Sequence, residues 1–219
     1  MEKQEFITLL QEARKVSEKR NFSQSFDLII NLKNINLKKE EERINLFMNV
    51  PHERGKKVRI TALVGSELEA KAKKCCDHVV MDEQFRSLDK KAIKKIAAES
   101  DFFIAQSTIM PKIAATFGKI LGPRGLMPNP KSGCVVPPTA DLTLVTKHLQ
   151  TLIRLETKNE FAVKTRIGTE AMKDEDVADN AVAIFNTILH TLPQEKNNIK
   201  SVVIKTTMGK PVLYGGVEE

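Results

Sequence analysis

The pattern that most constrains the fold is a regular alternation of short apolar runs with longer amphipathic segments in the middle of the chain. Apolar runs at 58–64, 78–81 and 102–105 alternate with helical patterns at 67–76, 88–98, 107–121 and 141–152. Strands that alternate with helices of about ten residues indicate a doubly wound, Rossmann-like α/β domain. Residues 58–157 are therefore predicted to form one such domain.

The two ends of the chain combine strands of period two with one helix each. Helices are predicted at 3–20 and 173–192, strands at 26–32, 43–50, 161–167, 200–207 and 212–214, and a solvated turn at 38–43. Because residues 1–57 and 158–219 each hold too few elements for a core, we expect one discontinuous α+β domain with its helices on one face of a sheet. The α/β domain is then an insertion, and the two chain crossings would form a hinge.

The chain is basic, with 35 Lys and Arg against 28 Asp and Glu and a formal net charge of +7. This balance favours a polyanionic partner, such as a nucleic acid or an acidic membrane surface. No apolar run reaches the roughly 18 residues that a membrane span needs, and the N-terminus lacks the basic-then-apolar plan of a signal peptide. We therefore expect a cytoplasmic protein that is not inserted in a membrane.

Net charge alone does not locate a nucleic-acid site. Most acidic residues of the last segment cluster at 170–179, at the start of a helix, whereas the predicted strands of that segment carry Lys158, Lys164, Arg166, Lys200 and Lys205. If helices cover one face of the sheet, the opposite face or its edge is locally basic. Lysine clusters at 71–74 and 90–95 are competing phosphate contacts, although a solvated helix face explains them more simply.

The sequence offers little support for catalysis. Its three cysteines and four histidines have no metal-ligand spacing, so neither a metal nor another cofactor is expected. Residues 125–132 have the spacing of a phosphate-binding loop, but Pro130 stands where the second glycine belongs and has no N–H to give. No nucleophile-elbow or zinc-protease motif is present. An enzyme that binds a nucleotide or metabolite in the inserted domain remains the alternative reading.

The Gly/Pro-rich stretch 118–133, GKILGPRGLMPNPKSG, must be a shaped loop because proline fixes φ and glycine admits positive φ. Its first part resembles the signature of the universal ribosomal protein family of the mobile side stalk of the large subunit. The resemblance extends over nearly the whole chain, and residues 21–34 look most like the archaeal branch. It implies an RNA-binding protein rather than an enzyme.

The candidate site lies where the strand beginning near Ser201 ends at Thr207, Met208 and Gly209. Hydroxyl groups there suit ribose and phosphate oxygens, and glycine permits close approach of a nucleic-acid backbone. From the residues alone a plain turn is the more common explanation. The resemblance, however, implies RNA contacts by Phe22, Ser25, Asp27, Ser201, Thr207, Met208 and Gly209, and more weakly by Lys164 and Arg166. Phe22 would otherwise be assigned to a core.

The family resemblance implies a function and a set of partners. The protein would bind the side stalk of the large rRNA near the exit site, assist release of deacylated tRNA, and repress its own mRNA through a similar RNA fold. It would be a monomer when free. A regulator that binds only mRNA would use the same residues. Lys210 stands between Gly209 and Pro211, where the family commonly has proline directly after glycine, and the chain ends in Glu218 and Glu219 without a lysine-rich tail.

Overall fold

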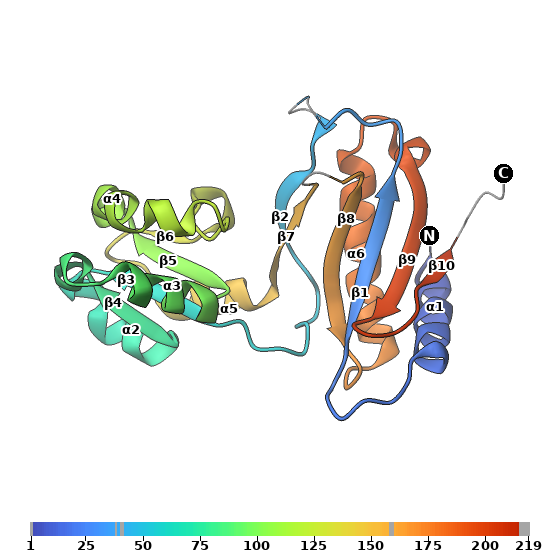
Figure 1. Cartoon of the computed structure of the whole chain (residues 1–219), viewed down its shortest axis with the longest axis horizontal. Coiled ribbons are helices and arrows are strands. Elements are labelled where there is room, and N and C mark those ends of the chain that lie inside the picture. The colour runs from blue at the N-terminus through green and yellow to red at the C-terminus, as the bar shows by residue number, and fades with distance from the viewer. Residues whose placement is uncertain (1, 38, 40–41, 158–159, 215–219) are drawn as a thin grey trace. The chain divides into compact units, whose positions relative to one another are not determined.

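A computed structural model describes residues 2–37, 39, 42–157 and 160–214. It divides into two compact units (Figure 1). One unit combines the residues up to 56 with those from 151 onward, and the other comprises Lys57–Gln150. Lys158, Glu218 and Glu219, and three positions of the expected turn at 38–43 (38, 40 and 41), lie outside the described residues. No helix in the described ranges is both long and apolar enough to cross a bilayer.

The discontinuous unit is built on a four-stranded antiparallel sheet in the order β10-β9-β1-β8. Its strands are β1 (Ser25–Leu32), β8 (Ala162–Thr169), β9 (Ile199–Thr206) and β10 (Val212–Tyr214). Alternate residues of β1, from Phe26 to Leu32, are buried. They belong to the same core cluster as the apolar faces of the two helices, because successive strand residues point to opposite faces. The helices thus cover one face, and Figure 1 shows α6 behind the sheet.

Both helices of this unit begin with favourable charges. Helix α1 (Lys3–Val16) starts with a capping box between Glu2 and Glu5, which satisfies backbone N–H groups of its first turn. Helix α6 (Asp174–Thr191) has three acidic residues in its first turn, near the positive end of the helix dipole. The rings of Phe6 and Phe185 meet edge to face at 6.0 Å, which joins the two helices across the core.

Arg14 of α1 fixes the loop that leads into α6. Its guanidinium donates to Asp174 Oδ1 (2.9 Å) and to the carbonyl oxygens of Glu170 (2.9 Å) and Met172 (3.1 Å). The same group lies 4.9 Å from the centre of the Phe26 ring, a cation–π arrangement. One side chain therefore ties the start of α6 to the first residues of β1.

A second, two-stranded sheet belongs to the same unit. Strand β2 (Asn45–Asn49) pairs antiparallel with β7 (Leu152–Glu156). The sequence predicted a helix up to residue 152 and an inserted domain up to residue 157, whereas in the structure helix α5 (Leu142–Thr151) ends directly before this strand. The reason is burial, because Leu152, Ile153 and Leu155 are all buried, and the last two join the main core of the discontinuous unit.

The second unit confirms the predicted α/β class. Its parallel sheet has the order β4-β3-β5-β6. The chain adds β4 on one side of β3 and then β5 and β6 on the other side, and this change of side is typical of doubly wound folds. The strands are β3 (Ile60–Val64), β4 (His78–Met81), β5 (Phe102–Gln106) and β6 (Val135–Val136), and the helices are α2 (Glu69–Cys75), α3 (Lys90–Glu99), α4 (Met110–Leu121) and α5. The two-residue strand β6 was not predicted.

The Gly/Pro-rich stretch follows α4 as a shaped loop. Gly125 and Gly133 have φ values of 69° and 70°, which glycine adopts without steric cost. Between them, Leu126 and Met127 pack against the core cluster that contains Phe117 and Leu121. The loop therefore has a packing role within its own unit.

Candidate nucleic-acid interface

The start of β1 and the end of β9 meet at one end of the antiparallel sheet. The backbone N–H of Thr207 donates to the Ser25 carbonyl oxygen (3.0 Å), and the Ser25 N–H donates to Thr207 Oγ1 (3.1 Å). The Thr207 hydroxyl also donates to the Ser25 carbonyl oxygen (3.2 Å). The structure thus brings together two segments far apart in the sequence, residues 22–25 and 206–209, which we call the corner.

The buried side chain of Gln24 links the two segments of the corner by hydrogen bonds, although the sequence did not indicate this residue. Its side chain is 1% exposed and donates to Ser17 Oγ and to the Glu18 carbonyl oxygen, both at 3.1 Å. Its Oε1 accepts the backbone N–H of Met208 (3.1 Å). Because both ends of the amide are bound, Gln24 fixes the path of the chain at Met208. Nothing in the local sequence distinguishes this glutamine from a surface residue.

Gly209 is required by close packing. A Cβ at this position would lie 2.1 Å from Thr206 Oγ1 and 3.4 Å from Ser17 Oγ. Thr206 is fully buried, and its hydroxyl shares a 2.9 Å hydrogen bond with Ser17 Oγ. The glycine is therefore explained by contacts within the protein, in addition to the close approach of RNA that was expected from the sequence.

Two large apolar side chains of the corner are exposed. Phe22 is 54% exposed and Met208 is 63% exposed, and Thr207, next to Met208 in the chain, is also exposed. Phe22 thus lies outside the core to which composition alone would assign it. An aromatic ring held at the surface is suited to stacking on a base.

The face of the sheet opposite the helices carries a row of charges. Asp27 of β1 pairs in register with Arg166 of β8 and with Lys205 of β9, so the three side chains share one face. Partial burial raises the pKa of Asp27 above its usual range, and the attraction of Lys205 and Arg166 opposes this shift. The row has one more positive than negative charge, which suits a phosphate backbone.

Of the remaining predicted residues, Lys164 and Ser201 lie farther along the sheet, and Arg166 belongs to the row of charges. Lys164 is in register with Ile29 and forms an ion pair with Glu160. Arg166 has a buried Nε atom without a hydrogen-bond partner among the described residues. Ser201 accepts a hydrogen bond from Asn31 (2.9 Å) and lies six residues before Thr207, about 20 Å away in a strand. Ser201 is only 8% exposed, so it does not add to the surface, whereas Lys164 is exposed and Arg166 is partly exposed.

The described residues contain no arrangement typical of a catalytic or metal site. No group of three or more His, Cys, Asp or Glu side chains gathers there to hold a metal ion. Burial raises the pKa of the Cys76 thiol to about 12, so this cysteine is protonated and a poor nucleophile at neutral pH. The surface combines exposed apolar groups and hydroxyls at the corner with cations on the adjoining sheet, and such groups are suited to binding a polyanion.

Comparison with known proteins identifies the family. The model of the ribosomal protein L1p/L10e family matches residues 11–210, and the chain belongs to this family. The large ribosomal subunit protein uL1 of Nanoarchaeum equitans is 41% identical over 199 residues, covering 89% of this chain and 92% of that protein. The uL1 proteins of Thermococcus kodakarensis and Pyrococcus abyssi are 38% and 36% identical and cover 96% and 98% of this chain, and 97% of each relative.

These matches confirm the family that the glycine-rich stretch indicated and the archaeal branch that residues 21–34 indicated. Proteins of this family are ribosomal proteins and not enzymes. The alternative of a nucleotide- or metabolite-binding enzyme in the inserted unit is therefore set aside.

Proposed function

We propose that this protein binds the mobile side stalk of the large rRNA through the corner and the adjoining open face of the sheet. Its relatives are proteins of the large ribosomal subunit, and family membership places it on the cytoplasmic ribosome. The observation that carries the proposal is the corner itself. Its two strand ends are locked to each other by hydrogen bonds, while Phe22 and Met208 remain exposed beside them.

The corner favours recognition of folded RNA by shape. A hydroxyl has one hydrogen and two lone pairs, so the Thr207 hydroxyl, which donates to and accepts from Ser25, retains one lone pair that can accept from a ribose 2′-OH. Phe22 supplies a stacking surface, and Ser25 and Asp27 supply further acceptors. Because these groups are already positioned, little conformational entropy is lost on binding.

Two further activities belong to the same proposal. The corner would bind a similar fold in the protein's own mRNA and so repress its translation. The protein would also contact exit-site tRNA and assist the release of deacylated tRNA as the stalk moves. The connectivity supports this second role, because the chain passes between the units twice, near residues 56 and 150, and such double crossings are typical of hinges. The free protein would be a monomer.

The test compares binding to a side-stalk fragment of large-subunit rRNA with binding to an unrelated hairpin of equal length, over a series of salt concentrations. Shape-specific recognition predicts that the preference for the stalk fragment persists as salt rises, since only the phosphate contacts weaken. Equal and steeply salt-dependent binding to both RNAs would refute the proposal. Tight binding to an mRNA element with no binding to the stalk fragment would favour the mRNA-only regulator.

A pair of variants assigns the binding to the corner. Phe22→Ala removes a ring that is 54% exposed, and Leu144→Ala removes an apolar side chain that is 66% exposed in the other unit. Loss of one base–aromatic stack costs about 1–3 kcal/mol, so the Phe22 variant should lose about 5-fold to 150-fold in affinity. The Leu144 variant should bind like the unmodified protein. Equal affinities for both variants would exclude Phe22 from the interface.

A further inference from the structure

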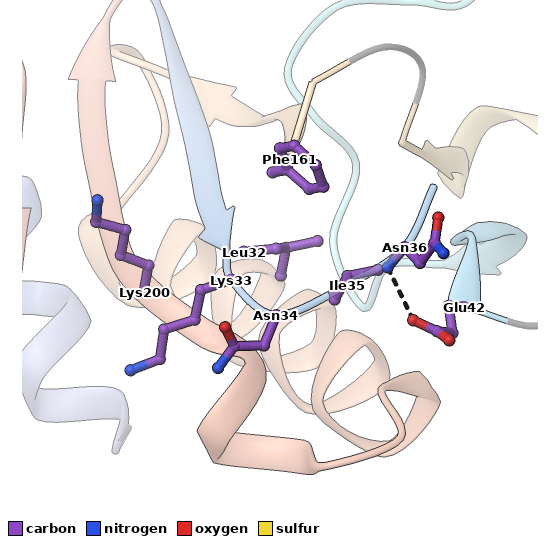
Figure 2. A pocket seen from close by; sticks show the side chains of 8 residues that line it. All are labelled: Leu32, Lys33, Asn34, Ile35, Asn36, Glu42, Phe161 and Lys200. Carbon is purple, nitrogen blue, oxygen red and sulfur yellow. Dashed lines mark hydrogen bonds between the residues drawn. The ribbon is translucent and has the colours of Figure 1, made fainter. Parts of the chain in front are cut away.

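A pocket of about 480 Å³ opens at the end of the main sheet opposite the corner. It is lined by Leu32 at the end of β1 and residues that follow it, by Phe161 just before β8, and by Lys200 at the start of β9 (Figure 2). Strand β1 runs from the corner at Ser25 to the pocket at Leu32, a distance of about 23 Å at the usual rise of a strand. None of the residues selected from the sequence as RNA contacts lines it.

The floor of the pocket is held rigidly by backbone contacts. The N–H of Leu32 donates to the Phe161 carbonyl oxygen (2.7 Å), and the N–H of Lys33 donates to the Asn198 carbonyl oxygen (2.8 Å). The Asn198 side chain, 1% exposed, donates to the carbonyl oxygens of Lys33 (3.1 Å) and Asn34 (3.3 Å). Asn34 has a φ of 57°, an uncommon conformation for a residue with a side chain. The pocket therefore exists before any ligand binds.

The pocket combines an exposed aromatic ring with cations. Phe161 is 53% exposed, and Figure 2 shows its side chain above those of Leu32 and Ile35. Lys33 and Lys200 both lie on the side of the pocket away from Glu42. Within the described part of the chain, neither lysine has a carboxylate at ion-pair distance.

The opposite side of the pocket is negative. Glu42 accepts the backbone N–H of Asn36 (2.8 Å) and pairs with Lys39 (3.1 Å), and these contacts hold its pKa below the usual range. Glu42 is thus ionised at neutral pH, and because Lys39 offsets its charge, this side of the pocket attracts a phosphate less than the side with Lys33 and Lys200 does. A ligand with one flat apolar part and one anionic group is therefore oriented, with its anionic group toward Lys33 and Lys200.

We propose that this pocket binds one unpaired nucleotide of the RNA that the corner engages. The base stacks on Phe161, and the phosphate groups beside it lie near Lys33 and Lys200. The inference rests on the proposed function, since it requires RNA on the sheet, but it adds a second point of contact. RNA held at the corner and at the pocket would span the full length of β1.

The chain provides a clean spectroscopic test, because it contains no tryptophan. Phe161→Trp places a unique indole in the pocket, and Phe22→Trp places one at the corner. Each variant is titrated with the side-stalk fragment of large-subunit rRNA while tryptophan fluorescence and total binding are followed together. Stacking on a base should quench the fluorescence of both variants, with saturation at the same RNA concentration as total binding.

The outcomes separate the two proposals. Quenching of the Phe22→Trp variant with unchanged fluorescence of the Phe161→Trp variant would overturn the pocket inference and leave the proposed function intact. Absence of RNA binding by both variants and by the unmodified protein would overturn both.

Substitution of the lysines gives an independent measurement. Each phosphate contact contributes about 0.7 to the slope of log affinity against log salt for single-stranded nucleic acid. The double variant Lys33→Gln, Lys200→Gln should therefore lower the slope by about 1.4. Lys196→Gln, which changes an exposed lysine near the same end of the sheet but outside the pocket lining, should leave the slope unchanged. Equal slopes for the double variant and the unmodified protein would overturn the phosphate contacts.

Discussion

Replacement of Gly209 by alanine should damage both the stability and the RNA affinity of the corner. The new methyl group would lie 2.1 Å from Thr206 Oγ1, so a realistic contact requires a shift of about 1 Å. Thr206 is fully buried, and rotation of its side chain would break the hydrogen bond to Ser17. We expect a cost of about 2 kcal/mol, of which about half comes from the hydrogen bond and half from the strained rotamer.

The assay combines thermal unfolding with binding to the side-stalk fragment. A loss of about 2 kcal/mol corresponds to a fall in Tm of about 4–8 °C in a protein of this size. Affinity should fall as well, because Met208 and Gly209 would be displaced from their positions beside Gln24. Gly118→Ala is the matched control, since a Cβ there has no atom within 4 Å and alanine in a helix is favoured by about 1 kcal/mol.

A second substitution tests the mechanism. Thr206→Ala removes the atom that the new methyl group would strike, so the double variant should lose less stability than the sum of the two single variants. Strictly additive losses would show that the contact with Thr206 is not the cause. A Gly209→Ala variant that melts and binds like the unmodified protein would refute the account of the corner altogether.

Three further predictions concern neighbouring groups. Thr207→Val should weaken stalk-RNA binding by about 2-fold to 10-fold, which is the value of one hydrogen bond, and should lower Tm by about 2–4 °C because the hydroxyl bonds to Ser25. Thr207→Ser should retain both the affinity and the Tm. A lower Tm with unchanged affinity would assign the hydroxyl to structure alone. Asp27→Asn should raise Tm at pH 7. The raised pKa of Asp27 means that its stabilising contribution is present at low pH and is lost as pH rises through the folded-state pKa, so the advantage of asparagine should shrink on acidification; a pH-independent difference in Tm would contradict this. Arg14→Lys should lower the free energy of unfolding, measured by chemical denaturation, by about 1–3 kcal/mol, because lysine cannot reproduce the planar guanidinium that contacts Asp174 and two carbonyl groups. An unchanged denaturation midpoint would contradict this role of Arg14.

The sequence predicted the strongly periodic elements well. The alternation in β1 and the helical spacing in α6 are local signals, and the structure places both elements where they were expected. Strand β7 was missed because it follows a helix without a break and only three of its five residues are apolar, a run too short to separate a helix end from a buried strand. Its partner β2 is about 100 residues away in the sequence.

The candidate site was predicted only in part, for a related reason. Thr207 and Phe22 lie in stretches that resemble a known family, whereas Gln24 and Ser17 act through side-chain hydrogen bonds to Met208 and Thr206. Such contacts depend on how distant segments pair, which no local pattern encodes. The pocket depends in the same way on Asn198, whose amide fixes the turn after β1.

The connectivity of the main sheet determines when the protein becomes functional during synthesis. Strand β1 is made early but lies between β8 and β9, so its partners are synthesised only after the whole unit Lys57–Gln150. The continuous unit Lys57–Gln150 can fold before them, as domains generally do when complete. The corner needs both Ser25 and Thr207, so a chain that stops before β9 cannot form the corner at which we propose that RNA binds. A ribosome that stalls before β9 therefore releases a product that cannot compete with complete protein for the RNA.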